Sequence, residues 1–283
     1  MKHTIDIDGE RRDIEIKAMD ESFVVYRKMY VPPLTAENIG TIGPHDDVKQ
    51  LERFRREGWL KVMEAFFRKE IRAIGSCAVL AWDGDGVIGK MHFTTREMWD
   101  AFRQAGGWYC VDHESMPKII QGLSDEQIGD LLASPSRTLY VPCFNIGHFD
   151  ARYHGKGIAS AMIAFLKDWA RQRNWRRIEM PSCPDVVPYK VLGGHVLRRS
   201  GLERRGFRLG RQEGISAEEA AGRREAIRRI LSGELWPQSD WYMKFCGDDI
   251  ARVRKLASDD PSWEGDCDQD YVMAYDLRSS GSS

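Results

Sequence analysis

The chain has 283 residues, of which 42 are basic and 43 acidic, so its formal net charge at pH 7 is −1. This balance produces no overall field that would attract nucleic acid or an anionic membrane surface. No apolar stretch is long enough to span a bilayer, and no signal-peptide pattern follows Met1. We therefore expect a soluble, cytoplasmic protein that binds neither nucleic acid nor membrane.

The cysteines form no Cys-x-x-Cys pair and have no zinc-ligand spacing. There are six of them, at positions 77, 110, 143, 183, 246 and 267. We expect reduced thiols, several of them buried, and no metal site.

The first third of the chain alternates helical and extended patterns. It predicts a strand around 14–17, a helix around 22–30 and a long amphipathic helix around 46–72. Two β-rich runs follow, at 77–82 and 87–93, and a glycine-rich turn joins them as a hairpin.

A further strand is predicted at 138–146. The residues before it contain Ser124-Asp125-Glu126-Gln127, a capping box that predicts a short helix through Leu131 and Leu132. Farther along, Ser216-Ala217-Glu218-Glu219 predicts a second capped helix, which ends near Gly233.

The most informative stretch is an octet that lies between the strand at 138–146 and an amphipathic helix. It consists of Arg152, Tyr153, His154, Gly155, Lys156, Gly157, Ile158 and Ala159. The two glycines allow the backbone to wrap around phosphate oxygens, and the free N–H groups of the following helix lie at the positive end of its dipole. Arg152 and Lys156 add positive charge, so the octet predicts a pyrophosphate-binding loop.

Two common phosphate-binding loops do not fit the octet. A P-loop requires Gly-Lys-Ser/Thr, whereas the chain has Gly155-Lys156-Gly157-Ile158 without a hydroxyl for magnesium. A dinucleotide fingerprint requires a third glycine, and Ser160 occupies that position.

The pattern Arg/Gln-x-x-Gly-x-Gly/Ala, directly after a strand and opening a helix, resembles the acetyl-coenzyme A loop of the GNAT acetyltransferase superfamily. The resemblance extends to the family's second to seventh strands, which match 77–82, 87–93, 138–146, 175–180, the stretch after 204–207, and 271–277. It implies an α/β fold with a mixed, mostly antiparallel central sheet flanked by helices. The expected organisation is one domain over 1–278 with helical insertions at about 95–137 and 214–268, followed by a flexible tail at 279–283.

The resemblance also implies acetyl-CoA as co-substrate, no metal, and direct attack by a small-molecule primary amine in a ternary complex. Residues 144–147, including Asn145, Ile146 and Gly147, would contact the pantetheine arm. A backbone N–H near Asn145 or Ile146 would polarise the thioester carbonyl.

The proton donor is the position at which the chain departs from the family pattern, because Leu202 stands where many members carry a tyrosine. Candidate replacements are His195, Tyr189 and Cys183. If 195–205 is helical, His195 and Leu202 share a face; a surface histidine is the alternative. Cys183 is a candidate for an acyl-enzyme as well, although a buried structural thiol is favoured.

Candidates for the general base are Glu179 and His92. Glu179 points either into the cleft or, as slightly favoured, to solvent. A water chain that replaces any single base is a further alternative.

Aromatic residues are frequent in both insertions and predict either a hydrophobic acceptor pocket or, more often, core. They are Trp99, Phe102, Trp108 and Tyr109 in the first insertion, and Trp236, Trp241, Tyr242 and Phe245 in the second.

Two other functions remain open: an acyl-CoA-binding sensor without catalysis, and a protein or peptide acetyltransferase, which the bulky insertions disfavour. The acceptor, the acyl length and the oligomeric state, including a homodimer, are left open by the sequence.

Overall fold

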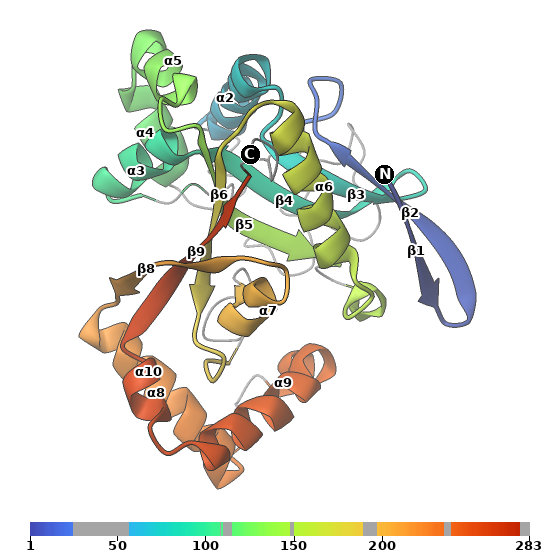
Figure 1. Cartoon of the computed structure of the whole chain (residues 1–283), viewed down its shortest axis with the longest axis vertical. Coiled ribbons are helices and arrows are strands. Elements are labelled where there is room, and N and C mark those ends of the chain that lie inside the picture. Colours follow the sequence, from blue (N-terminus) through green and yellow to red (C-terminus); the bar gives the residue numbers. More distant parts are fainter. Residues whose placement is uncertain are drawn as a thin grey trace, which may run out of the picture. The chain divides into compact units, whose positions relative to one another are not determined.

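The computed structural model describes residues 1–24, 57–107, 109, 115–147, 150–188, 197–234 and 239–277. Where the sequence predicts one domain with insertions, the chain divides into two compact units (Figure 1). Unit 1 comprises Met1–Ile178 and Asp276–Ser283, and unit 2 comprises Glu179–Tyr275. The predicted tail at 279–283 lies outside the described residues.

Unit 1 is built on strands that are each antiparallel to the next in the sheet. They are β1 (Lys2–Ile7), β2 (Glu10–Ala18), β3 (Ala78–Asp83), β4 (Gly86–Thr95) and β5 (Thr138–Ile146). The predicted hairpin and the predicted strand at 138–146 are confirmed as β3–β4 and β5. Strand β1, which the sequence did not predict, pairs with β2 through a tight turn in which Asp8 and Gly9 have φ of 54° and 86°.

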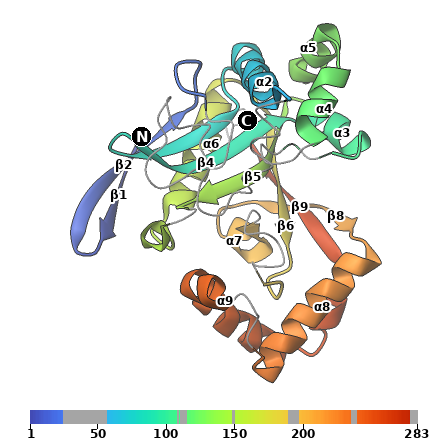
Figure 2. The same ribbon diagram turned by 180° about the vertical axis from the view of Figure 1, so that it is seen from behind.

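The helices of unit 1 lie on both faces of this sheet. They are α2 (Trp59–Ile74), α3 (Arg96–Gln104), α4 (Ser115–Gly122), α5 (Asp125–Ala133) and α6 (Ile158–Gln172), with a 3₁₀ turn η1 (Ala151–Tyr153) before α6. Consecutive strand residues point to opposite faces. In β4, His92 stacks on Phe67 of α2 with ring centroids 4.9 Å apart, whereas Phe93 lies 5.1 Å from Trp169 of α6. Helices α2 and α6 therefore cover opposite faces (Figures 1 and 2).

Local signals predicted helix α5 better than α2. The Ser124 hydroxyl accepts from the Gln127 N–H, and the Gln127 side-chain oxygen accepts from the Ser124 N–H. The predicted capping box is therefore confirmed. Helix α2 begins only after Gly58, which adopts a left-handed conformation with φ of 70°. The earlier part of the predicted helix, 46–56, lies outside the described residues, as does most of the predicted helix 22–30.

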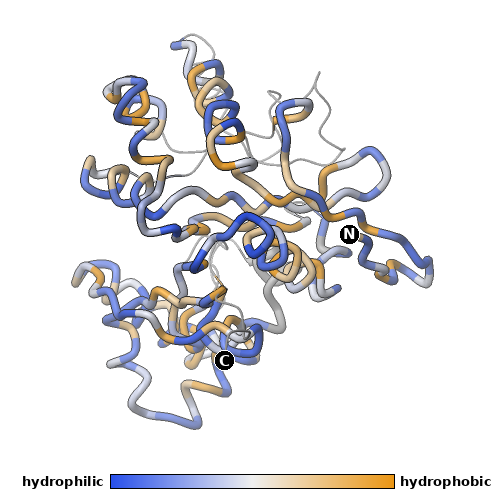
Figure 3. The backbone as a smooth tube through the Cα atoms, turned by 45° about the horizontal axis from the view of Figure 1, so that its top comes forward, coloured by the Kyte–Doolittle hydropathy of each residue, from blue (hydrophilic) through white to orange (hydrophobic). Residues whose placement is uncertain are grey.

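The aromatic side chains of the first insertion form core. Trp99, Phe102 and Tyr109 are 6%, 0% and 1% exposed, whereas Trp108 lies outside the described residues. Figure 3 shows hydrophobic and hydrophilic stretches alternating along the helical turns, as expected of helices with one buried side. In the second insertion, the side chains of Trp236, Trp241, Tyr242 and Phe245 lie outside the described part of the chain.

Unit 2 has strands and helices of its own. They are β6 (Arg177–Cys183, which begins at the end of unit 1), β7 (Leu197–Arg198), α7 (Arg199–Glu203), β8 (Arg208–Gly214), α8 (Ala217–Ser232), α9 (Ser239–Asp259), α10 (Trp263–Asp266) and β9 (Gln269–Asp276). Strand β8 is antiparallel to β9, and the short β7 is parallel to β6. Helix α8 has the predicted cap at Ser216 and ends at the left-handed Gly233. The predicted fold class, a mixed and mostly antiparallel sheet flanked by helices, is confirmed.

Candidate functional site

The described residues between β5 and α6, which include most of the octet, contain three glycines in conformations that other residues rarely reach. Gly147, Gly155 and Gly157 have φ of 52°, 70° and 80°. A Cβ at Gly147 would lie 2.6 Å from the carbonyl oxygen of Asp150, so this turn also requires the absence of a side chain. Gly157 is the N-cap of α6, and no side chain caps this helix. Its first-turn N–H groups, which have no intrahelical acceptors, are directed toward the loop.

His154 fastens the loop to the end of β5. Its Nε2 lies 3.1 Å from the carbonyl oxygen of Ile146 and 3.2 Å from that of Gly147. Because carbonyl oxygens only accept, Nε2 carries the proton and donates to both. His154, which the sequence assigned to the phosphate loop, therefore holds the end of β5 in position.

Tyr153 fastens the loop to the sheet. Its hydroxyl donates to Oδ2 of Asp83 at 2.8 Å, and Arg12 of β2 donates to the same oxygen at 3.1 Å. Burial, followed by the hydrogen bond to Asp83, raises the pKa of Tyr153 to about 12, so the hydroxyl remains a donor across the physiological range.

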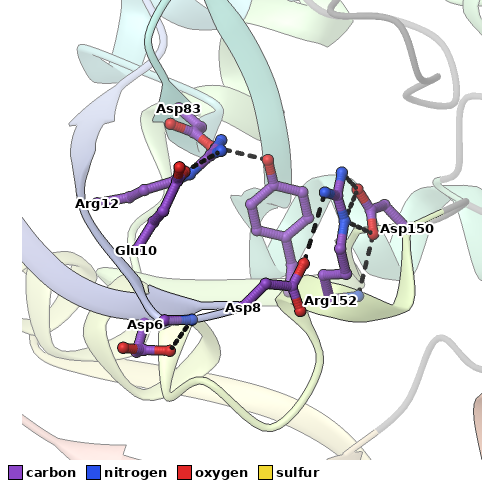
Figure 4. A network of polar contacts seen from close by, with 9 residues as sticks. Asp6, Asp8, Glu10, Arg12, Asp83, Asp150 and Arg152 are labelled. Carbon is purple, nitrogen blue, oxygen red and sulfur yellow. Dashed lines mark hydrogen bonds and ion pairs between the residues drawn. The ribbon is translucent and has the colours of Figure 1, made fainter.

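The charge on Arg152 is already paired within the loop. Its guanidinium donates to both carboxylate oxygens of Asp150, the shorter contact being 2.6 Å, and lies 3.9 Å from Asp8 (Figure 4). The hydrogen bonds from Arg152 hold the pKa of Asp150 below its usual range, and Asp150 raises the pKa of Arg152. The sequence predicted that Arg152 and Lys156 would both attract a bound anion. Because Asp150 and Asp8 balance most of the charge of Arg152, Lys156 and the backbone N–H groups remain to attract it.

The register of β4 and β5 decides which backbone groups of β5 point toward β4 and which point away from it. The Gly147 N–H donates to the Ile88 carbonyl at 2.7 Å. In antiparallel pairs, hydrogen-bonded and non-hydrogen-bonded positions alternate, so Asn145, opposite Lys90, also bonds toward β4. The N–H of Ile146 therefore points away from β4. Of the two residues expected to polarise a thioester, the register favours Ile146.

Strand β5 is bulged within the same segment. His92 lies opposite Cys143, but Thr94 lies opposite Tyr140, so β5 holds one residue more than β4 in this interval. Pro142, which has no N–H to donate, lies inside the interval. The bulge changes the direction of β5 just before residues 144–147, which the sequence assigned to the pantetheine arm.

A buried polar cluster covers the α2 face of β4. Glu70, which is 0% exposed, accepts from the Thr94 hydroxyl at 2.6 Å and from the Tyr109 hydroxyl. Burial raises the pKa of Glu70 to about 8. Nearby, His92 donates from Nδ1 to the Cys77 carbonyl at 3.2 Å. His92 is thus placed in a buried cluster, 2% exposed, with its ring against α2.

Two of the predicted catalytic residues of unit 2, Glu179 and Cys183, lie in the described part of the chain. Glu179 is 7% exposed and accepts from Arg211 at 3.3 Å, so the slight preference for a solvent-facing carboxylate was wrong. Cys183 is 0% exposed among apolar side chains, and burial raises its pKa to about 12. This environment suppresses the thiolate that an acyl-enzyme would need.

Tyr189 and His195 lie outside the described residues. The condition that 195–205 be helical is met only in part, because Leu197–Arg198 forms β7 and α7 spans Arg199–Glu203. The argument that His195 shares a helical face with Leu202 therefore does not hold.

Sequence reasoning missed Glu70, although a signal was present. Glu70 occupies the apolar side of α2, three or four residues from Phe66, Phe67 and Ile74. A lone carboxylate on an apolar helix face is a recognisable sign of a buried acid. His3 and Asp83, which contact the loop from distant strands, had no such local signal.

Comparisons with known proteins found no family model and no curated protein that match the chain. Solved structures that resemble it include acetyltransferases, one of them of the GNAT family, and a GNAT-like decarboxylase. One, from Streptococcus pneumoniae, is 11% identical over 94% of this chain and 99% of its own, with a TM-score of 0.40. A putative acetyltransferase from Salmonella typhimurium, solved with acetyl-CoA, is 9% identical over 95% of this chain and 96% of its own, with a TM-score of 0.39. A polyamine N-acetyltransferase from Drosophila melanogaster is 14% identical over 73% of this chain and 90% of its own, with a TM-score of 0.36.

No group of three or more His, Cys, Asp or Glu side chains in the described residues is arranged to hold a metal ion. No helix among them is long and apolar enough to cross a membrane.

Proposed function

We propose that the chain transfers an acetyl group from acetyl-CoA to the primary amine of a small molecule, by direct attack in a ternary complex. One observation carries the proposal: the glycine loop at the start of α6, which no side chain caps, follows strand β5, in which the N–H of Ile146 points away from β4. A pyrophosphate on the loop and an amide-containing arm along β5 are parts of one ligand, coenzyme A.

The loop supports binding of the pyrophosphate. Gly155 and Gly157 have positive φ, a Cβ at Gly155 would meet nothing within 4 Å, and α6 adds the positive end of its dipole. Because Arg152 is paired with Asp150, we assign the main attraction to backbone N–H groups and Lys156.

The end of β5 supports binding of the acyl group. An N–H at Ile146 would donate to the thioester carbonyl oxygen and stabilise the negative charge that develops there as the amine attacks. The amine nitrogen forms a bond to the carbonyl carbon, the carbon–sulfur bond breaks, and the coenzyme leaves as a thiolate that takes up a proton.

The proton-transfer groups are proposals of lower rank. Tyr189 and His195 are candidates for protonating the thiolate, and Glu179 and His92 are candidates for removing the proton of the amine. Cys183 is the weakest candidate, because its thiol lies in the hydrophobic cluster of unit 2.

The test measures coenzyme binding and turnover separately. Calorimetry with CoA should give saturable binding to the purified chain, and acetyl-CoA with a panel of arylalkylamines, polyamines and aminoglycosides should release free thiol. Gly157→Val, a β-branched residue at a position with φ of 80°, should lose CoA binding. Absence of both CoA binding and thiol release in the wild type would refute the proposal.

A second candidate, a CoA-binding sensor without catalysis, is favoured by one observation. Leu202, at the position where the family pattern has tyrosine, is 0% exposed and has no proton to give. Tight CoA binding without thiol release across the panel would favour the sensor. Loss of turnover with retained binding in Tyr189→Phe or His195→Ala would exclude it.

A further inference from the structure

We propose that the N-terminal β1–β2 hairpin is part of the coenzyme site, and that His3 is a positioning residue that orients the phosphate loop. The inference rests on the proposed function, since it assigns a role to His3 at the same loop. It concerns a residue separated from the loop by 153 positions in the chain.

The alternation along β1 directs His3 to the correct face. Ile5 and Ile7 are 5% and 2% exposed, and His3 precedes them at the same spacing of two residues. His3 lies opposite Ile14 of β2, and Glu15 lies opposite Trp82 of β3, so the row continues from Ile14 to the neighbouring Asp83. One row across three strands thus ends in His3 and Asp83, which both contact the loop.

The contact made by His3 fixes one peptide unit of the loop. Its Nε2 lies 2.9 Å from the carbonyl oxygen of Lys156, so Nε2 donates to that oxygen. A planar trans peptide points its C=O and N–H in opposite directions. Holding the Lys156 carbonyl toward β1 therefore aims the N–H of Gly157 away from the sheet, where a phosphate oxygen can accept it.

The geometry around Gly157 confirms how close the ring lies. A Cβ built on Gly157 would be 3.3 Å from His3 Nε2. The glycine thus serves two purposes: it allows φ of 80° at the start of α6, and it leaves room for the imidazole.

Two further contacts join the hairpin to the loop. Arg12 of β2 and Tyr153 of η1 share the Asp83 carboxylate of β3, and Asp8 in the hairpin turn lies 3.9 Å from Arg152 (Figure 4). Among the described strands, β1 lies at the edge of the sheet and pairs with β2. Because these contacts join the hairpin to the loop, occupancy of the loop should stabilise them, and removing the His3 contact should weaken phosphate binding.

The test compares His3→Ala, His3→Gln and the control Thr4→Ala, using three ligands. Thr4 is the next residue on the same strand; its hydroxyl donates to Asp13 at 2.7 Å, away from the loop. The ligands are CoA, ADP, which carries a pyrophosphate without the thiol arm, and pantetheine, which carries the arm without phosphate. Their dissociation constants are measured by calorimetry.

We expect His3→Ala to weaken CoA and ADP by about tenfold, the effect of one hydrogen bond, and to leave pantetheine unchanged. His3→Gln keeps an N–H donor and should restore CoA to within about threefold of wild type, and Thr4→Ala should match wild type. In the acetylation assay, His3→Ala should raise KM for acetyl-CoA without lowering kcat.

Four outcomes would overturn the role of His3: unchanged CoA affinity in His3→Ala, an equal loss for pantetheine, no recovery in His3→Gln, or an equal loss in Thr4→Ala. Each leaves the proposed function intact as long as the wild type binds CoA. If the wild type binds neither CoA nor ADP, the proposed function falls and this inference falls with it.

Discussion

Glu70 accepts a hydrogen bond from Thr94, with 2.6 Å between the hydroxyl and carboxylate oxygens, at a position where neither side chain is exposed. The second carboxylate oxygen accepts from Tyr109, and a helix, a strand and an inserted segment thereby meet at one acid. Burial outweighs these hydrogen bonds and raises the pKa of Glu70 to about 8.

The raised pKa predicts a pH-dependent stability. With a pKa of about 8 in the folded state against an ordinary 4.5, the folded protein binds the proton more tightly than the unfolded chain does. The contribution of Glu70 is therefore complete at low pH and is lost as the pH rises between these values, by up to about 1.4 kcal/mol per pH unit. Urea unfolding across this range should show the decline in wild type and a flatter profile in Glu70→Gln. Glu64→Gln, at a half-exposed site on the same helix, is the control and should keep the decline.

Gly147 and Gly155 form a matched pair for testing the loop backbone. Both have positive φ, but a Cβ at Gly147 would lie 2.6 Å from the Asp150 carbonyl oxygen, whereas a Cβ at Gly155 meets nothing within 4 Å. Gly155→Ala should lower the free energy of unfolding by about 1 kcal/mol through backbone strain. Gly147→Ala adds overpacking and should cost about 3 kcal/mol, with loss of CoA binding in calorimetry. Equal effects of the two substitutions would contradict the steric argument.

The pairing of Arg152 with Asp150 predicts a gain of affinity on mutation. Asp150→Asn keeps an oxygen for the Arg152 N–H but removes the charge that balances the guanidinium. At low ionic strength we expect CoA to bind about threefold more tightly, and this gain should disappear in high salt and in an Arg152→Ala background. Asp168→Asn, which breaks the pair with Arg171 farther along α6, is the control and should leave CoA affinity unchanged.

The environment of Cys183 predicts an unreactive thiol. Because burial raises its pKa to about 12, the thiolate that reacts with iodoacetamide is scarce in the folded protein. Peptide mapping should find Cys183 alkylated in urea but protected under native conditions. Cys183→Ala should retain acetyl transfer within about twofold, since removal of a buried, inert thiol affects stability more than chemistry. Acetyl bound to Cys183 after incubation with acetyl-CoA would contradict this view.

Features encoded by neighbouring residues could be predicted from the sequence. The cap of α5 at Ser124, the cap of α8 at Ser216 and the strand at 138–146 depend on contacts within a few positions, and each is present. The sequence predicted one continuous helix over 46–72, because the hydrophobic period continues through Gly58. The backbone of Gly58 is left-handed, and helix α2 begins after it, at Trp59. A pattern of side chains does not record such a change of backbone conformation.

The octet by itself determined that this chain has a glycine loop suited to a pyrophosphate, because backbone freedom and a helix start are local properties. Only the tertiary structure decided which charges remain for a ligand. Arg152 is balanced by Asp150 and Asp8, and His3 reaches the Lys156 carbonyl from the edge of the sheet. Such partners are brought together by strand register and helix packing, so their effect on the loop follows from the fold as a whole.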